Sequence, residues 1–218
     1  MSPLWRERVT LGFYPDRLVL ARARGEETVA VPPCEAPAER WRAALEALAG
    51  VESLRRAEVT VVLSSFFVRY TIVQLAAAIA AAPERLALAR HCLARVHGAA
   101  ADWTVRLSGE VACAVDPLLV QALRDALAAR ANRLRALQPR LMASFNGCRR
   151  KLDGRASWFV DVEPGLATLA LVVKESWQSL RTVRVRARWQ DELAALIARE
   201  SCLVDSPADC PRLVHASP

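Results

Sequence analysis

The alternation of hydrophobic and polar positions divides the first part of the chain into short strands and one helix. Residues 8–31 contain three apolar runs, "RVTLGFYP", "RLVLARA" and "ETVAVP", separated by turn-forming Pro, Asp and Gly residues. Residues 36–51 place their apolar side chains on one face at helical spacing. The run "EVTVVLSS", residues 58–65, is typical of a strand buried on both faces. This part of the chain predicts a three-stranded meander, a helix and a fourth strand.

The same order of elements begins again later in the chain. The elements predicted in between are a strand at 66–75, a helix at 83–98, a hairpin at 102–116, a helix at 116–134 and a strand at 135–146. From Trp158 three further strands and a helix follow, up to residue 203. A β-β-β-α-β order that starts twice is typical of two-lobed ribonuclease-H-like or actin-like proteins, although this link from order to fold is an analogy. The predicted fold class is α/β with mixed sheets.

The composition is that of a globular protein with a basic surface. The 218 residues are 53% hydrophobic and 24% charged, with a formal net charge of +7. Almost all the positive charge is Arg, since Lys151 and Lys174 are the lysines. A basic chain permits binding to an acidic peptide or an anionic membrane surface, but by itself it is weak support for nucleic acid. The six cysteines form no C-x-x-C pair, and the charged opening "MSPLWRERV" is unlike a secretory signal, so reduced thiols in the cytoplasm are expected.

One apolar segment, residues 59–82, is long enough to be considered as a membrane-spanning helix. Arg69 lies near its middle, and a central Arg costs about 2.5–3.5 kcal/mol on insertion scales. The uncharged run that follows Arg69 is too short to span a bilayer. The segment therefore predicts buried strands.

The amino-acid sequence of the central segments resembles that of a known group of proteins. The stretches "VTVVLSSFFVRYTIVQL", "LALARHCLARVHGAAADWTVRL", "ACAVDPLLVQALRDAL", "RLRALQPRLMASFN" and "WFVDVEPGLATLALVV" resemble PilM-type pilus assembly proteins and the cytoplasmic actin-like domain of GspL-type secretion proteins. The resemblance covers roughly residues 8–200 and implies an actin-like fold with two lobes around a nucleotide cleft. It implies a first lobe at 1–150 with a small subdomain inserted at about 66–107, a truncated second lobe at 151–203 and a loose tail at 204–218.

The first phosphate hairpin of such a fold is altered in this sequence. An actin-like hairpin reads roughly D-[IV]-G-x-x-[ST], in which Asp holds the metal and backbone amides approach phosphate. In the matching stretch "LGFYPDRLVL", Gly12 stands where the Asp is expected, followed by bulky Phe13 and Tyr14. Pro15 also removes a backbone donor. This hairpin is not expected to hold a phosphate.

The second phosphate hairpin keeps part of the pattern. Asp161 and Thr168 are present, but Glu163 and Pro164 occupy the turn, where a carboxylate repels phosphate and Pro lacks an N–H. The glycine-rich adenosine-binding element has no counterpart after Trp189. Asp161 is therefore expected to cap its own turn, and no cofactor is expected.

Enzymatic alternatives remain open at this stage. One is an actin-like ATPase that uses Asp161; another is a metal-dependent nuclease of the ribonuclease-H type, which needs several carboxylates around two metal ions. Glu58, Asp102 and Asp116 are the further candidates for a nuclease, but they do not fall at matching strand positions. His91 and His97 point away from each other on a helix, so a metal site between them is not expected.

The leading prediction is a protein-binding adaptor without catalytic activity. The resemblance implies a cytoplasmic component of a type IV pilus or type II secretion-like platform. It is also compatible with peripheral attachment to the inner membrane. It also implies that a short cytoplasmic tail of a PilN-like membrane protein binds beside the inserted subdomain. The residues expected to line that groove are Phe66, Phe67, Val68, Arg69, Tyr70 and Arg95.

Two further surfaces are predicted from the second lobe. Strand alternation places Arg184, Arg186 and Arg188 on one face. With Arg149, Arg150 and Lys151 nearby in the sequence, this face is either a basic patch that docks an acidic peptide or lipid headgroups, or a merely solvated face. Nucleic acid is not expected, because only Trp177 and Trp189 lie in these strands as aromatic platforms. A truncated lobe also leaves a sheet edge, which predicts a homodimer through residues 158–188.

Overall fold

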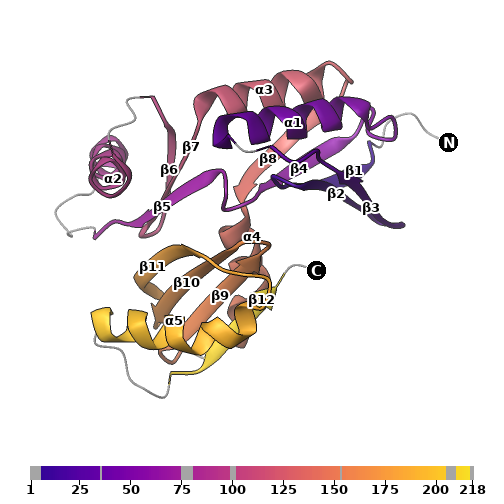
Figure 1. Cartoon of the computed structure of the whole chain (residues 1–218). Helices are drawn as coiled ribbons and strands as arrows, with labels where there is room; N and C mark the ends of the chain where they lie inside the picture. The colour runs from indigo at the N-terminus through magenta and orange to yellow at the C-terminus, as the bar shows by residue number, and fades with distance from the viewer. Residues whose placement is uncertain are drawn as a thin grey trace. The chain divides into compact units, whose positions relative to one another are not determined.

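The computed structural model describes residues 6–34, 36–74, 81–98, 102–152, 154–204 and 210–216. The chain divides into two compact units, each of which combines two separate stretches of sequence. The first unit comprises Met1–Val68 and Val115–Arg140, and the second comprises Arg69–Ala114 and Leu141–Pro218. Figure 1 shows the elements of each unit, which are described in turn below.

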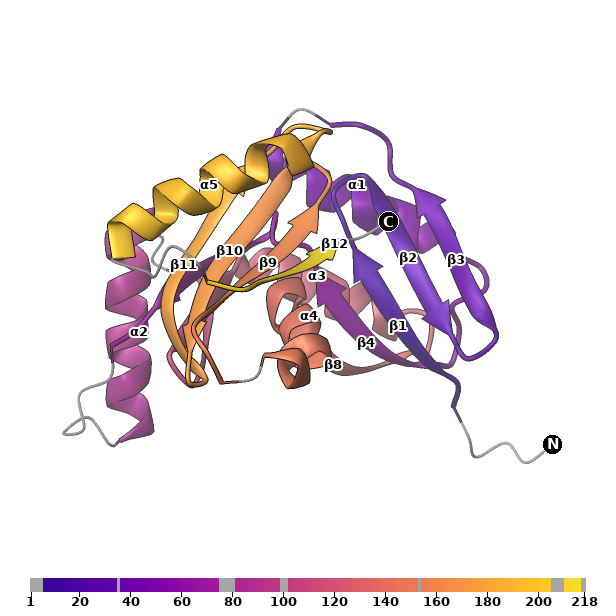
Figure 2. The same cartoon turned by 90° about the horizontal axis from the view of Figure 1, so that it is seen from below.

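The first unit is built on a five-stranded sheet in the order β3-β2-β1-β4-β8. Neighbours β1, β4 and β8 are parallel, whereas β2 is antiparallel to both β1 and β3 (Figure 2). The strands are β1 (Arg8–Phe13), β2 (Arg17–Arg22), β3 (Gly25–Ala30), β4 (Glu58–Leu63) and β8 (Arg133–Pro139). The predicted meander, helix and fourth strand of this unit are confirmed.

Two helices, α1 (Pro37–Gly50) and α3 (Pro117–Ala128), lie side by side against this sheet. The start of α3 follows from its sequence, since Pro117 occupies the first turn and the Asp116 side chain accepts a hydrogen bond from the Leu118 N–H at 2.8 Å. Leu119, Leu123 and Leu127 are buried along one face of the helix, whose spacing of four residues buries a continuous stripe.

The inserted subdomain consists of a three-stranded sheet and one helix. Its sheet has the order β5-β7-β6, with β5 (Val68–Ile72), β6 (Thr104–Ser108) and β7 (Val111–Val115), and its helix is α2 (Ala82–His97). Ala89 and Leu93 of the helix pack with Val73, Val105, Ala112 and Ala114 in one apolar cluster. The predicted end near residue 107 was wrong, because β7 forms the central strand of this sheet and completes the insertion at Val115.

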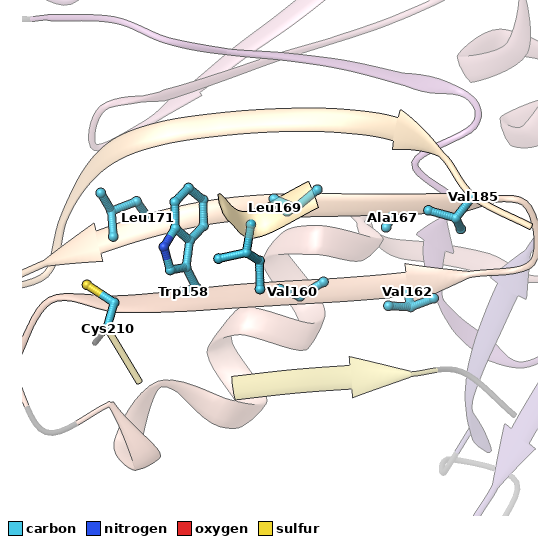
Figure 3. Close-up of a cluster of buried hydrophobic side chains, with 9 residues drawn as sticks. Trp158, Val160, Val162, Ala167, Leu169, Leu171, Val185 and Cys210 are labelled. Atoms are coloured by element: carbon cyan, nitrogen blue, oxygen red, sulfur yellow. The ribbon is translucent and has the colours of Figure 1, made fainter. Parts of the chain in front are cut away.

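The other sheet of the second unit has the order β11-β10-β9-β12. Its strands are β9 (Ser157–Glu163), β10 (Leu166–Val173), β11 (Ser176–Arg184) and β12 (Arg212–Ala216). Figure 3 shows the apolar cluster that Trp158, Val160 and Leu169 form with neighbouring side chains of β9 and β10. Helix α5 (Trp189–Val204) adds Ile197 to this cluster, so alternate residues of β9 are buried against the helix.

Two boundaries predicted in the second half of the chain were wrong. The strand predicted at 135–146 ends at Pro139, and helix α4 (Arg140–Cys148) follows, because Leu141 and Phe145 share a helical face that a short apolar run does not distinguish from a strand. The tail predicted to be loose from residue 204 contains β12, which pairs in parallel with β9. Cys210, just before β12, is buried in the apolar cluster.

The apolar segment 59–82 contains β4 and β5, while its residues 75–80 lie outside the described ones. In the described part of the chain, no helix has the length and hydrophobicity needed to cross a membrane.

Candidate functional site

The first phosphate hairpin joins β1 to β2, and its backbone is covered by the ring of Tyr14. Gly12 pairs with Val19 across the hairpin, and a Cβ added to Gly12 would lie 2.6 Å from Cε2 of Tyr14. Real Cβ atoms do not approach other atoms so closely. Gly12 is therefore required here for the close approach of an aromatic ring, which is a different use of glycine from the cradling of a phosphate.

A buried arginine fixes the position of that ring. Nη1 of Arg140 donates a hydrogen bond to the hydroxyl oxygen of Tyr14 at 2.7 Å, and Arg140 is only 5% exposed. The guanidinium carbons of Arg17 and Arg140 lie 5.1 and 5.7 Å from the centre of the Tyr14 ring, within the range of cation–π attraction. The Tyr14 amide donates to the carbonyl of Arg17 at 3.1 Å, so this amide is used within the turn.

The second phosphate hairpin joins β9 to β10 and contains Asp161. The Asp161 side chain is fully buried, and its Oδ1 accepts a hydrogen bond from Nδ1 of His215 at 2.9 Å. His215 lies opposite Asp161 in the parallel pairing of β12 with β9. The prediction that Asp161 caps its own turn was therefore wrong about its partner. Sequence reasoning does not indicate His215, because it predicts a loose tail where the structure has β12.

The pair of Asp161 and His215 continues as a polar row across all four strands of the sheet. Thr168 pairs with Asp161 on one side and with Thr182 on the other, and the two threonine hydroxyls lie 3.1 Å apart. Asp161 and Thr168, which match the phosphate pattern in sequence, thus both have protein partners on this face of the sheet. Glu163, at the end of β9, is 4% exposed, and Pro164 follows it in the turn.

The other carboxylates considered for a nuclease are Glu58, Asp116 and Asp102, and two of them have structural roles. Glu58 lies 3.7 Å from Arg8 and 3.9 Å from Arg133 in an ion-pair cluster along three parallel strands. Asp116 caps α3, and Asp102 is exposed. Among the described residues, no three His, Cys, Asp or Glu side chains are grouped so that they could hold a metal ion.

The residues predicted to bind a partner differ in their accessibility. Phe66 lies 4.7 Å beneath the guanidinium of Arg40, and Phe67 packs against Phe13 with 5.5 Å between ring centres. Both phenylalanines are half-buried. Within the inserted subdomain, Arg69 and Arg95 are exposed.

The remaining two residues of that predicted set are buried. Val68 is 2% exposed and Tyr70 is 6% exposed, and Nε2 of His97 lies 2.8 Å from the carbonyl oxygen of Tyr70. Because buried side chains cannot be reached without rearrangement, Val68 and Tyr70 are poor candidates for direct contact with a partner.

The three arginines predicted to share a strand face do not do so. Strand β11 ends at Arg184, and the two others lie in the connection to α5. Arg186 is 3.8 Å from Glu192, and Arg188 is 3.0 Å from Asp191. The predicted strand face was wrong in its bounds, because the strand ends at the first of the three arginines, although all three side chains are exposed.

A contact absent from the sequence predictions joins the inserted subdomain to the β10–β11 turn. The Glu110 carboxylate accepts hydrogen bonds from the hydroxyl of Ser176 at 2.9 and 2.8 Å and from the backbone N–H of Trp177 at 2.7 Å. No local pattern indicates this contact, because the partners are more than sixty residues apart in sequence.

Two thiols have raised pKa values. The Cys34 thiol donates a hydrogen bond to Glu39 at 3.2 Å, and this bond, together with burial, raises the pKa of Cys34. Burial raises the pKa of Cys113 on β7. Neither thiol is therefore an activated nucleophile.

The sequence matches no family model and no curated protein. The structure is similar to a Bacteroides thetaiotaomicron protein with an actin-like ATPase fold and unknown function, with a TM-score of 0.63 and 6% identity over 97% of this chain and 82% of that chain. It is similar to the cytoplasmic domain of EpsL, an inner-membrane component of the Vibrio cholerae type II secretion system, with a TM-score of 0.60 and 17% identity over 97% of this chain and 84% of that one. A chain of the PilM–PilN type IV pilus biogenesis complex gives a TM-score of 0.56 and 16% identity over 89% of this chain and 65% of that chain. The predicted actin-like fold, and the resemblance to GspL-type and PilM-type proteins in fold, are confirmed.

Proposed function

We propose that this chain is a non-catalytic, protein-binding component of a type IV pilus or type II secretion-like assembly, and that its nucleotide site is degenerate. The observation that carries the proposal is the position of Tyr14 over Gly12. A phosphate in that hairpin would need the space that the ring fills and the backbone donors that Pro15 lacks. The fold shared with EpsL and a chain of the PilM–PilN complex supports the assembly role.

The second hairpin supports the same proposal. In an actin-like site the hairpin Asp faces a metal ion, whereas here the Asp161 carboxylate accepts a hydrogen bond from an imidazole. The Thr168 hydroxyl is likewise paired with Thr182. Binding a metal-bound phosphate at this position would require these contacts to break.

Calorimetry with Mg-ATP and with Mg-ADP tests this half of the proposal. We expect no saturable heat for either nucleotide. Saturable heat with a stoichiometry near one site per chain would reject the degenerate site, and the alternative of an actin-like ATPase using Asp161 would then be favoured. An Asp161→Asn variant would show whether that heat comes from the second hairpin.

The proposed partner is a short cytoplasmic tail of a PilN-like membrane protein, which would place the chain in the cytoplasm at the inner membrane. Arg69 and Arg95 are exposed cations on the inserted subdomain, and Phe66 and Phe67 are partly accessible aromatic side chains. Aromatic and Arg side chains are the residues that most often dominate binding energy at interfaces.

A binding assay with a synthetic tail peptide of a PilN-type protein tests the partner. We expect Arg69→Glu combined with Arg95→Glu to weaken binding by at least about tenfold, since close charge pairs at interfaces couple by about 1.5 kcal/mol or more. Arg124→Glu, an exposed residue on α3, is the control that should bind normally. Equal affinity of the double variant and the wild type would reject the mapping.

We also propose self-association through the outer strand of the second sheet. Strand β11 lies at the end of the order β11-β10-β9-β12, and strand edges readily pair with another chain. Light scattering should show a dimer, and an added charge at exposed Gln178, as in Gln178→Lys, should disfavour it. A wild-type monomer at high concentration would refute this proposal.

A further inference from the structure

The second unit contains a pocket of about 150 Å³ at the end of the sheet where β9 begins and β10 ends. It is formed by α4, the short 3₁₀ helix η1 (Arg149–Lys151), the connection to β9 and the β10–β11 turn. The residues that line it are Phe145, Arg149, Leu152, Gly154, Arg155, Val172 and Glu175. The pocket contains neither the phosphate-hairpin residues nor the six residues predicted to bind a PilN-like tail.

The pocket combines apolar side chains with a cationic rim. Phe145, Leu152 and Val172 supply the apolar lining, and all three are buried or half-buried. The Phe145 ring is fixed by packing, since its centre lies 4.6 Å from the Trp177 ring and 5.5 Å from the Phe159 ring. Phe145 therefore acts as a rigid wall of the pocket and does not offer an open face for base stacking.

The rim carries more positive than negative charge. Exposed cations stand at Arg149 and Arg155 in the pocket lining and at Arg150, Lys151 and Lys174 beside it. Among the described residues that line the pocket, the carboxylate is that of Glu175.

The ion pair at the rim can be exchanged for a ligand. Arg149 lies 3.7 Å from Glu175, and their side chains are 58% and 85% exposed. Pairs this exposed contribute little to stability, so an incoming anion can replace the carboxylate. Lys174 and Glu175 both have positive φ angles, 49° and 68°, as in the two-residue turns that join tightly paired antiparallel strands. The turn therefore places the backbone of Lys174 directly before Glu175, which lines the pocket.

We propose that this basic pocket binds the phosphate headgroup of an anionic phospholipid, and that the surface around it contacts an anionic membrane. Guanidinium groups match phosphate geometry through paired N–H donors, and cations beside the pocket add attraction to a surface that carries many phosphates. A volume of about 150 Å³ is below the usual 300–1,000 Å³ of pockets for drug-sized ligands, and it suits one headgroup. The inference does not depend on the proposed partner or on the state of the nucleotide site.

Co-sedimentation with vesicles tests the proposal on the full chain. One set of vesicles contains phosphatidylcholine alone, and the other contains equal parts of phosphatidylcholine and phosphatidylglycerol. We expect binding to the anionic vesicles only, with an affinity that falls as salt is added. Arg149→Glu combined with Arg155→Glu should weaken binding by at least about tenfold, because each basic residue near an anionic surface is worth roughly a factor of five.

The control variant has the same net charge as the pocket variant, but its two substitutions lie elsewhere in the same unit. Arg90→Glu combined with Arg106→Glu reverses two exposed arginines outside the pocket and should retain most of the binding. Equal losses in both variants would mean that binding follows net charge and would overturn the assignment of the pocket. Binding to neutral vesicles as strong as to anionic vesicles, or no binding to either, would also overturn it.

Two soluble anions, used as competing ligands, distinguish a membrane from other anionic ligands of the pocket. Glycerol phosphate in solution should not displace the protein from vesicles at moderate concentration, because it engages the pocket without the surrounding cations. Complete displacement would assign the pocket to a free phosphate compound instead. Binding of a poly-glutamate peptide that is lost in the Arg149→Glu and Arg155→Glu variant would assign it to an acidic protein segment.

Discussion

The carboxylate of Glu110 lies 2.7 Å from the backbone nitrogen of Trp177 and accepts its hydrogen. This bond and the two from Ser176 connect the tip of the β6–β7 hairpin to the β10–β11 turn. The inserted subdomain interrupts the first unit in sequence, between Val68 and Val115, yet it groups with the second sheet as one compact unit. Glu110 is therefore a connection between the subdomain and that sheet.

Replacing Glu110 with Ala should loosen the inserted subdomain. The change leaves the Trp177 N–H and the Ser176 hydroxyl without this acceptor, and an unsatisfied buried donor costs about 1–3 kcal/mol. Urea unfolding and proteolysis of β6 and β7 would measure the effect. Glu26→Ala, at an exposed position of β3, is the control and should change stability by less than about 0.5 kcal/mol. Equal stability of the two variants would show that the Glu110 bonds do not hold the subdomain.

Gly12→Ala should destabilise the first unit. The added Cβ would lie 2.6 Å from the Tyr14 ring, which Arg140 holds in place, and such overpacking costs about 1–3 kcal/mol. Gly147→Ala is a matched control, because a Cβ there meets nothing within 4 Å and alanine favours the helix α4. Thermal unfolding should therefore show opposite signs for the two substitutions. A neutral Gly12→Ala would mean that the ring moves aside easily.

His215→Ala should release strand β12 from the sheet. The substitution removes the hydrogen bond to the buried Asp161 carboxylate, and hydrogen bonds to charged groups contribute about 1.5–3 kcal/mol. Hydrogen exchange of residues 212–216 should become faster, while exchange in β10 should change little. Arg212→Ala, whose side chain is exposed on the same strand, should leave the exchange unchanged. Slow exchange in the His215 variant would show that main-chain pairing alone keeps β12 in place.

The reactivity of Cys34 should depend on Glu39. The hydrogen bond to the Glu39 carboxylate, followed by burial, raises the pKa of Cys34 because both favour the protonated thiol. Alkylation of Cys34 should therefore rise at a higher pH than for an ordinary thiol. Glu39→Gln removes the charge and should shift the alkylation profile to lower pH. Mass spectrometry of the modified peptide measures this shift, with exposed Cys202 as an internal reference. An unchanged profile would exclude Glu39 as the cause.

The sequence alone determined the local elements and the order in which they occur. The strand meanders, the helix start at Asp116 and the second hairpin at Asp161 follow from short-range rules, because alternation, capping and turn residues act within a few positions. That order predicted a ribonuclease-H-like or actin-like fold, and the resemblance to PilM-type and GspL-type proteins favoured the actin-like one. Predicted boundaries were wrong where a local pattern fits both a strand and a helix, as in the apolar run that forms α4.

The tertiary structure alone decided how the candidate sites are used. Tyr14 and Arg140 are 126 residues apart, and Asp161 and His215 are 54 apart, so no local pattern pairs them. The sequence showed that the phosphate pattern is altered at Gly12, but not that the ring of Tyr14 covers this glycine. The basic pocket beside Arg149 likewise exists only because α4 and the β10–β11 turn meet. Contacts between distant segments depend on how whole helices and strands pack, and local sequence patterns, which act within a few residues, do not specify that packing.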